Sequence, residues 1–390
     1  MKVLHVFGNW KWTGPAEPAV SLAEALSRSL AVTLAVGPCP FADLKNLVVA
    51  EAERRGLEPV IEPSLRKHLN ALRLPHAAKR VARLLEKVGP ELVHVHLDGD
   101  HAAVGLALRR GARAGAAGGP AIVRSFYEGA AAASGMRRRL LLRFATDGAI
   151  AVSQASFAEL RRAWPRAGQR LRLIEGGVDL ARFRPDLAAR ERGRARLDIA
   201  AGRFVVGVVA RVQRHRRFET LLAAFARARQ EQTNLVLAVI GRGTALEELA
   251  VRPAEKLGIK ESVRFPGYLA GAAYVEVLAA LDAAVFLVPG TDGSCRAVRE
   301  EMAMGVPVVV SATPPLPELV GDRAQGLVVQ VTEEALARAF VELARDPAEA
   351  RRLGEAARRK AERCFGLEQT AAEVEDLYRC VLSAEGAAQA

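Results

Sequence analysis

The chain has 390 residues, of which 50% are hydrophobic, and a formal net charge of +12 at pH 7. This length is more than one hydrophobic core usually serves, so we expect two domains. No run of about 18 uncharged apolar residues occurs, which argues against a transmembrane helix, and the four cysteines lack the spacing of a metal or redox motif.

The positive charge is unevenly distributed along the chain. Residues 1–185 hold 28 Lys and Arg against 16 Asp and Glu, whereas residues 186–390 hold 28 of each kind. An excess of cations on one half predicts an anionic partner there, such as a membrane surface, an acidic glycan or nucleic acid. The alternative is a general bias towards Arg and Ala, although a bias alone does not explain the asymmetry.

The first half alternates apolar runs of strand length with helical patterns. Its candidate strands are Lys2–Phe7, Ala31–Val36, Leu92–Val95, Ala121–Ser125, Ala149–Val152 and Leu171–Ile174, and its candidate helices are Glu17–Ser27, Ala77–Val88, Ala102–Arg110 and Ser156–Ala163. In the helix over 77–88, Lys79, Arg83 and Lys87 lie opposite an apolar side. This pattern fits an ordinary surface helix, or one that docks to an anionic membrane or acceptor.

The second half repeats the alternation, with candidate strands Phe204–Val209, Leu235–Ile240, Val263–Phe265, Ala284–Val288, Val306–Val310 and Leu327–Val331. Continuous Val, Ile and Leu strands between helices predict parallel sheets covered on both faces. The sequence therefore predicts an α/β protein with two doubly wound, Rossmann-like domains, residues 1–185 and 186–365, and a cleft between them. The stretch from Gly176 to about Gly202 lacks a strand and is the expected linker. Residues 366–390 continue a helical tail.

The stretch over 283–311 is the most informative part of the sequence. An apolar run leads into a turn that contains Asp292 and Gly293, and Ser294 is a candidate helix cap. A Gly and a Pro end the helix before a further apolar run. We read this stretch as a strand, a tight turn, a helix and a second strand.

This layout places two carboxylates on either side of a helix start. Asp292 lies just outside the helix and Glu300 about six residues inside it, which at 1.5 Å per residue separates them by roughly 9 Å. The backbone N–H groups of Ser294, Cys295 and Arg296 lie between them, and such a helix start attracts phosphate. A nucleotide sugar, which has a diphosphate between two hydroxylated rings, fits this arrangement.

The spacing of this segment resembles the donor-site signature of retaining glycosyltransferases of the family-4 type, which have the GT-B fold. In that signature an acidic residue, seven further residues and Glu precede Met-Ala-x-Gly-x-Pro-Val. Here Asp292 replaces the usual Glu, and Glu301 stands where Ala is usual. The stretches 177–185 (Gly-Val-Asp with a later Phe and Pro) and 263–267 (Val-Arg-Phe-Pro-Gly) also resemble family segments, in the expected order.

The resemblance implies two Rossmann-like domains that face a central cleft, with the helix of residues 366–390 crossing back to the first domain. It implies that the anomeric configuration is retained, that no metal or other cofactor is needed, and that the donor is a UDP- or GDP-sugar. The first domain would bind the acceptor and the second the donor.

The resemblance also assigns the residues after the strand over 204–209. Arg211 matches the family's Arg, Arg216 takes the place of its Lys, and Arg217 replaces a Gly. Two cations at the carboxyl end of a strand suit a pyrophosphate and the charge that develops as the nucleotide leaves. The alternative is a solvated basic loop. With Asp292 on the transferred sugar and Glu300 on the ribose hydroxyls, Arg211 and Arg216 complete the predicted catalytic set.

Gly241 and Gly243 follow the strand over 235–240 and resemble the family's Gly-x-Gly turn beneath the nucleotide. The alternative is a plain tight turn. A dinucleotide-binding fingerprint would need a third Gly and an acidic residue at the end of the next strand, and both are missing. The predicted donor-binding residues are Gly241, Gly243, Gly293, Ser294, Cys295 and Arg296.

The first domain offers four candidates for the acceptor side of the cleft, which are Trp12, Gly14, His96 and Tyr127. Gly14 is the best match to a family Gly-rich turn. Trp12 is placed to stack on a sugar of the acceptor, to touch lipid, or to pack over the sheet edge. His96 resembles the family's His at the end of its strand. A His is often found where this chain has Tyr127. The pair His94 and His96 could also bind a metal, but we favour a polar edge of the sheet.

These patterns predict a glycosyltransferase that moves a sugar from a nucleotide diphosphate donor to a glycan, lipid-linked or lipopolysaccharide-type acceptor. We expect it in the cytoplasm, or peripherally on the inner face of the plasma membrane, with no nucleic acid partner. Two alternatives remain open at this point. One is an epimerase or hydrolase of nucleotide sugars with the same fold, and the other is a non-catalytic module that binds membrane or nucleic acid through the basic half.

Overall fold

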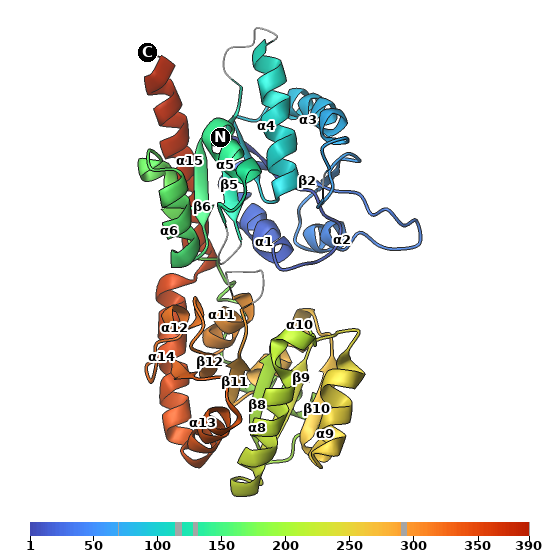
Figure 1. Ribbon diagram of the computed structural model, residues 1–390, viewed down its shortest axis with the longest axis vertical. Coiled ribbons are helices and arrows are strands. Elements are labelled where there is room, and N and C mark those ends of the chain that lie inside the picture. The colour runs from blue at the N-terminus through green and yellow to red at the C-terminus, as the bar shows by residue number, and fades with distance from the viewer. Residues whose placement is uncertain (69, 114–118, 128–131, 290–294, 390) are drawn as a thin grey trace. The chain divides into compact units, whose positions relative to one another are not determined.

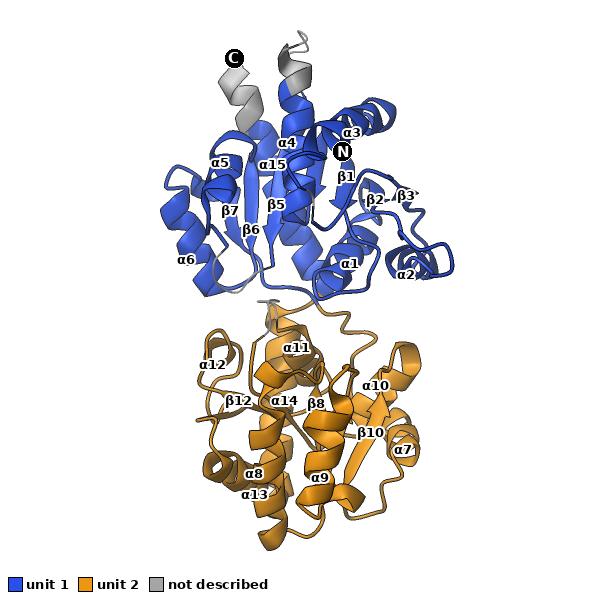
Figure 2. Cartoon of the chain, turned by 45° about the vertical axis from the view of Figure 1, so that its right-hand side comes forward, with its two compact units in different colours: residues 1–177, 291–294, 367–390 blue, residues 178–290, 295–366 orange. Residues whose placement is uncertain are grey.

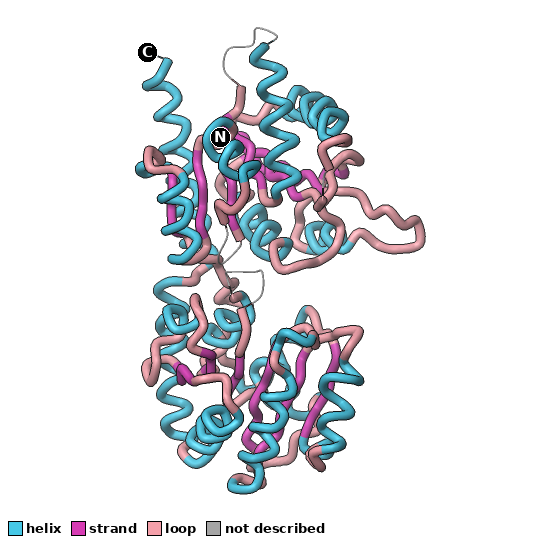
Figure 3. The backbone as a smooth tube through the Cα atoms, viewed as in Figure 1, coloured by secondary structure: helices cyan, strands magenta, loops and turns pink. Residues whose placement is uncertain are grey.

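The computed structural model describes residues 1–390 except 69, 114–118, 128–131, 290–294 and 390, and the side chains of 110–113 and 384–389 are likewise left out of the description. The chain forms two compact units (Figure 2), of which unit 1 contains residues 1–177 and 367–390 and unit 2 contains residues 178–290 and 295–366. The boundary expected at Pro185 lies at Gly177. In both units, helices flank a sheet (Figure 3).

The described part of unit 1 has a seven-stranded sheet in the order β3-β2-β1-β4-β5-β6-β7, and every neighbouring pair is parallel. The strands are β1 (Lys2–Phe7), β2 (Ala31–Val36), β3 (Val60–Ile61), β4 (Leu92–Val95), β5 (Ala121–Phe126), β6 (Gly148–Ala151) and β7 (Leu171–Leu173). The helices are α1 (Ala16–Leu26), α2 (Leu47–Arg54), α3 (Leu74–Val88), α4 (Asp98–Arg113), α5 (Met136–Phe144), α6 (Gln154–Ala163) and α15 (Leu367–Gln389) (Figure 1).

The described part of unit 2 has a six-stranded parallel sheet in the order β10-β9-β8-β11-β12-β13. The strands are β8 (Phe204–Val209), β9 (Leu235–Ile240), β10 (Val263–Gly267), β11 (Ala283–Phe286), β12 (Val308–Ser311) and β13 (Gly326–Val329). The helices are α7 (Leu187–Arg196), α8 (Phe218–Glu231), α9 (Arg252–Lys256), α10 (Gly271–Ala279), α11 (Arg296–Ala303), α12 (Leu316–Leu319), α13 (Glu333–Arg345) and α14 (Pro347–Cys364).

Both sheets are buried on both faces, as continuous apolar strands require. In unit 2, one core cluster packs α8 and α13 against one face of the sheet, and a second packs α10, α11 and α14 against the other. In unit 1, helix α15 supplies part of the core. Leu377 and Tyr378 are fully buried and pack in the cluster that contains Val3 of β1 and Val123 of β5.

The structure differs from the sequence prediction in its short or polar elements. The expected linker contains α7, whose close contact with α10 needs a glycine, because a Cβ on Gly193 would lie 1.8 Å from the carbonyl oxygen of Glu276. Helix α2 was missed, although Asn46 caps it by accepting from the backbone N–H groups of Val48 and Val49. No helix in the described ranges is long and apolar enough to cross a membrane.

Candidate functional site

The strand order of unit 2 reverses between β8 and β11, and the carboxyl ends of strands at such a reversal are where open α/β sheets bind ligands. Arg211 follows β8, and Gly241 follows β9. The segment after β11 includes Asp292, Gly293 and Ser294, which lie outside the described residues. The described part of the predicted donor site therefore consists of three segments: the loop after β8, the turn after β9 and the beginning of α11.

The loops after β8 and β9 are in direct backbone contact. A Cβ on Gly241 would lie 2.1 Å from the carbonyl oxygen of Ala210, and one on Gly243 would lie 2.2 Å from that of Val212. Gly241 also has a φ of 148°, which side-chain-bearing residues rarely adopt. Both glycines are thus required by close approach, and together they fix the loop that carries Arg211.

The two predicted cations of this loop differ in their surroundings. Arg211 is exposed, and no hydrogen bond or ion pair is recorded for its side chain within the described ranges. Arg216 is half-buried, donates to the carbonyl oxygen of Val288 at the end of the β11 segment, and has its guanidinium 5.9 Å from the ring of Phe286. Arg216 therefore ties the loop after β8 to the segment that leads to Asp292.

Arg217 occupies the position where the resemblance expects a glycine. Its backbone has a conformation that glycine adopts more easily than other residues. Its φ and ψ are 60° and 34°, in the left-handed region, and it is the N-cap of α8. The side chain is exposed, so the strain is in the backbone and not in packing.

Helix α11 begins at Arg296 with Cys295 as its N-cap, one residue after Ser294, the cap that the sequence predicts. Cys295 precedes the helix with φ 46° and ψ 47°, so its own peptide is not part of the first turn. Glu300 is 2% exposed; it accepts from Tyr274 Oη at 2.7 Å and from Arg296 Nη1 at 3.0 Å. Burial, followed by the nearby Glu300 carboxylate, raises the pKa of Tyr274 well above its usual value, so this hydroxyl remains a donor.

Glu301, next to Glu300, is fully buried, and neither of its carboxylate oxygens has a hydrogen-bond partner among the described residues. Burial, together with the neighbouring Glu300, raises the pKa of Glu301 well above its usual value, so the neutral acid is favoured. A buried neutral carboxyl therefore occupies the position where the resemblance expects an alanine.

In unit 1, His96 and Tyr127 belong to a buried chain of hydrogen bonds. His96 Nδ1 is bonded to Tyr127 Oη at 2.8 Å, and its Nε2 to His5 Nδ1 at 3.0 Å. His5 Nε2 lies 3.3 Å from Tyr378 Oη, which is 2.6 Å from His94 Nδ1. His96 and Tyr127, two of the four residues predicted for the acceptor side, are thus nearly fully buried, and His96 is linked through His5 to Tyr378 of α15.

The three histidines of this chain, His5, His94 and His96, could hold a metal ion by proximity alone, since one ring nitrogen of each lies within 4.8 Å of the others. All six ring nitrogens are already hydrogen-bonded, the last through His94 Nε2 to Ser125 Oγ at 2.8 Å. The rings of His94 and His96 are also stacked at 4.4 Å and 21°, so a single ion cannot lie in both ring planes. The geometry favours the polar network.

The remaining two acceptor-side candidates lie on the loop after β1. Trp12 packs against the core cluster under α1 and α2 and has the guanidinium of Arg55 5.5 Å from its ring. Gly14 is half-buried. The packing of Trp12 matches one of its predicted roles, a cover over the sheet edge.

Asp100 was not predicted as a site residue, yet it fixes the start of this loop. Its carboxylate accepts from the backbone N–H of Gly8 at 3.0 and 3.1 Å and from that of Leu97 at 3.1 Å. Complete burial raises the pKa of Asp100 to about 7. The acidic residues after His96 were the signal that could have identified it.

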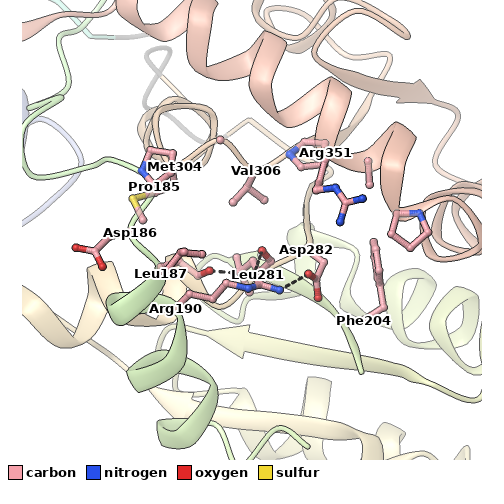
Figure 4. Close-up of a pocket in the computed structure, with 15 residues that line it drawn as sticks. Pro185, Asp186, Leu187, Arg190, Phe204, Leu281, Asp282, Met304, Val306 and Arg351 are labelled. Atoms are coloured by element: carbon pink, nitrogen blue, oxygen red, sulfur yellow. Dashed lines mark hydrogen bonds and ion pairs between the residues drawn. The ribbon is translucent and has the colours of Figure 1, made fainter. Parts of the chain in front are cut away.

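A hollow of about 470 Å³ in unit 2 lies at the amino ends of the strands of that unit (Figure 4). Phe204, Asp282 and Val306, which precede or begin β8, β11 and β12, line it together with Arg190. Arg190 donates to Asp282 at 2.5 Å and to the carbonyl oxygens of Ala279 and Leu281. The polar groups of Arg190 stabilise the packing of α7. The hollow lies at the amino ends of the strands, whereas open α/β sheets generally bind ligands at the carboxyl ends.

Family models match nearly the whole chain. The model described as Glycosyltransferase Family 4 matches residues 14–182, and that described as Glycosyl transferases group 1 matches residues 189–360. A D-inositol 3-phosphate glycosyltransferase of Streptomyces avermitilis is 32% identical over 62% of this chain and 53% of its own length. A GDP-mannose-dependent alpha-(1-6)-phosphatidylinositol monomannoside mannosyltransferase of Mycolicibacterium smegmatis is 33% identical over 47% and 49%. The matches thus cover about half the length of these relatives.

Solved structures share the fold. The Anabaena protein Alr3699/HepE in complex with UDP has a TM-score of 0.77 at 18% identity, over 96% of this chain and 99% of its own. WaaG, a glycosyltransferase involved in lipopolysaccharide biosynthesis, has a TM-score of 0.65 at 16% identity, over 95% and 99%. With two parallel sheets flanked by helices, and with both family models matched, this chain belongs to the group 1, family-4-type glycosyltransferases and has the GT-B fold.

Proposed function

We propose that this protein transfers a sugar from a nucleoside diphosphate sugar to a hydroxyl group of an acceptor, with retention of configuration and without a metal ion. The observation that carries the proposal is the set of residues at the strand-order reversal of unit 2. The cation-bearing loop after β8, the glycine turn after β9 and the start of α11 are the elements that a diphosphate needs. HepE, a structural relative, has been solved with UDP and with UDP-glucose.

Each side chain has a role that its surroundings suit. Arg211, exposed at the end of β8, neutralises the charge that develops on the diphosphate as the glycosyl bond breaks. Glu300, held by Tyr274 and Arg296, presents a fixed carboxylate to the ribose hydroxyls. Arg216 positions the segment that contains Asp292, which would contact the transferred sugar. The departing phosphate takes the acceptor proton, so no protein nucleophile is required.

The acceptor is proposed from unit 1 and from the names of the relatives. Those names include an inositol phosphate, a phosphatidylinositol mannoside and lipopolysaccharide. A glycan, polyol or lipid-linked acceptor of the cell envelope, reached from the cytoplasmic side, is consistent with these names and with the basic character of residues 1–185.

Arg211→Ala should lower kcat/KM for sugar transfer at least tenfold, which is about 1.4 kcal/mol of transition-state stabilisation. The matched control is Arg214→Ala, because Arg214 is an exposed arginine of the same loop that is paired with Glu248. Donor binding is measured first, by thermal shift against UDP- and GDP-sugars, where a ligand at 100 times its Kd adds roughly 2.7 kcal/mol.

Equal transfer rates in the two arginine variants would refute the assignment of Arg211. Consumption of the donor at the same rate with and without acceptors would instead indicate an epimerase or hydrolase. If no nucleotide sugar shifts the melting temperature and none is consumed, the proposed function fails as a whole.

A further inference from the structure

A second hollow lies entirely in unit 1, where the chain leaves β4 and where β5 carries Arg124. It has a volume of about 420 Å³. Lys67, Arg124, Arg137 and Arg138 line it, and the only carboxylate among its described lining residues is that of Asp98. Helix α4 begins at Asp98, and Gly99 of its first turn also lines the hollow, so the positive end of a helix faces it.

Arg124 is the least expected residue of this hollow, because its side chain is charged and only 1% of it is exposed. Nη2 donates to Asp98 Oδ1 at 3.2 Å, but Nε and Nη1 have no hydrogen-bond partner within the described ranges. The guanidinium lies 5.1 Å from the ring of Phe126. Buried donors without acceptors destabilise the folded protein, so a compensating group is expected.

Asp98 does not supply enough charge to be that group. It is shared, since Arg138 donates to its Oδ2 from Nε at 3.0 Å and from Nη2 at 2.8 Å. Although burial opposes it, the pair of arginines holds the pKa of Asp98 below its usual value, so the carboxylate stays charged. One negative charge against four cations leaves the hollow strongly positive, and two buried donors of Arg124 remain unused.

We propose that this hollow binds a phosphate group carried by the acceptor, with Arg124 at its floor and Lys67 and Arg137 at its entrance. A phosphate monoester supplies up to two negative charges and three acceptor oxygens, which matches unused donors that a second carboxylate would match less well. This inference rests on the proposed function and names the acceptor class, a phosphorylated polyol or sugar or a phospholipid headgroup.

Calorimetric titration of the whole protein tests the site without any turnover. The probes are inorganic phosphate, glucose 6-phosphate with glucose as its neutral counterpart, and vesicles that contain phosphatidylinositol. Arg137→Ala should weaken phosphate-ester binding by roughly fivefold to tenfold. Arg139→Ala, an exposed arginine of the same helix α5 that does not line the hollow, should leave it unchanged.

The phosphate affinity of the Asp98→Asn variant distinguishes a phosphate-binding hollow from one whose charged residues are only structural. Removing the resident carboxylate should tighten phosphate binding at least threefold, whereas a damaged pocket would weaken it. Arg124→Lys keeps the charge but not the fork of donors, and should weaken binding by about tenfold. If this variant fails to fold, the Arg137 and Asp98 variants still decide the question.

The outcomes distinguish a phosphate on a soluble acceptor from one on a lipid headgroup. They also distinguish a failure of this inference from a failure of the proposed function. Binding of glucose 6-phosphate that depends on Arg137 identifies a soluble acceptor, and Arg137-dependent binding of the vesicles alone identifies a lipid headgroup. Equal affinity for glucose 6-phosphate and glucose with no vesicle binding, or equal affinities in the Arg137 and Arg139 variants, overturns the inference. Donor binding, measured separately, then leaves the proposed function standing.

Discussion

The buried Glu301 lowers the free energy of unfolding of unit 2 by an amount that depends on pH. Because its pKa is raised in the folded protein, its contribution to stability is fully present below its unfolded value of about 4.5 and is lost as pH rises. At neutral pH the folded state must either keep this proton or bury an unpaired charge. A position that a small apolar residue would fill more stably is thus occupied by an acid.

Glu301→Leu should therefore stabilise unit 2 at pH 8 by about 1–3 kcal/mol. The gain should shrink as pH falls towards 4.5, and below that value the native acid becomes neutral in the unfolded state as well as in the folded state. Chemical unfolding at pH 5 and pH 8 measures this difference. Glu355→Leu, on the exposed side of α14, is the control and should show no such trend; a gain that is equal at both pH values would contradict the argument.

At the scale of single elements, most strands could be predicted from sequence and the short elements could not. Lys2–Phe7, Phe204–Val209 and Leu235–Ile240 have the bounds that their apolar runs predict, because strands buried on both faces have no polar interruption. The strand Val60–Ile61 has only two residues, both exposed, and gives no pattern. Helix α7 has no recognisable helical pattern in the sequence because its arginines obscure the helical period.

The candidate site shows the same division. For Gly241 and Gly243 the close contacts explain why the turn needs glycine, and their contact with a nucleotide stays a prediction. The start of α11 was misplaced because the left-handed conformation of Cys295 has no sequence signal. Tyr274, which holds Glu300, is on α10, far away in sequence, and Arg124 is buried by tertiary packing, so neither could be found from local pattern.

The N-cap of α8 stores strain that a single substitution should release. Arg217→Gly should stabilise the protein by roughly 0.5–1 kcal/mol, because relief of a left-handed conformation that costs about 1–2 kcal/mol exceeds the extra entropy of glycine in the unfolded chain. Arg227→Gly, in the middle of the same helix, should instead destabilise by about 1 kcal/mol. Urea midpoints at constant slope test both, and a loss in the first variant would show that the side chain matters more than the backbone.

Helix α15 is attached to unit 1 by a polar group as well as by its apolar face. Tyr378→Phe should cost about 2 kcal/mol, because it leaves His94 Nδ1 and His5 Nε2 buried without their partner. Tyr268→Phe is the control, since Tyr268 is 53% exposed. The melting temperature of unit 1, followed by fluorescence, distinguishes the two variants, and equal values would mean that the network adds nothing.

At the scale of the whole molecule, the two units should respond to acid in opposite directions. Burial lowers the pKa of four histidines of unit 1, to about 3 for His5 and His101 and well below the usual value for His94 and His96. Each contributes stability that is complete above pH 6.5 and is lost as pH falls. Asp100, with a pKa of about 7, acts in the opposite sense.

These four histidines outnumber the two acids of unit 1 whose pKa is raised by burial, Asp100 and Asp147, so the stability of unit 1 should fall as pH drops below 6.5. In unit 2 the one described histidine, His215, is exposed, and Glu301 favours acid. The three tryptophans, at positions 10, 12 and 164, all belong to unit 1. Their fluorescence should therefore report unfolding near pH 5 while circular dichroism retains the signal of unit 2; a single coincident transition would refute this difference.

The position of α15 has a consequence for synthesis. In the sequence, nearly two hundred residues that form unit 2 lie between β7, the last strand of unit 1, and α15. A nascent chain whose seven strands have all left the ribosome still lacks Tyr378, so His94 Nδ1 and His5 Nε2 have no partner from α15 while the second half is translated. Unit 2 has no such dependence and is complete by Gly366. The half of the protein that is made first is thus the half that finishes folding last.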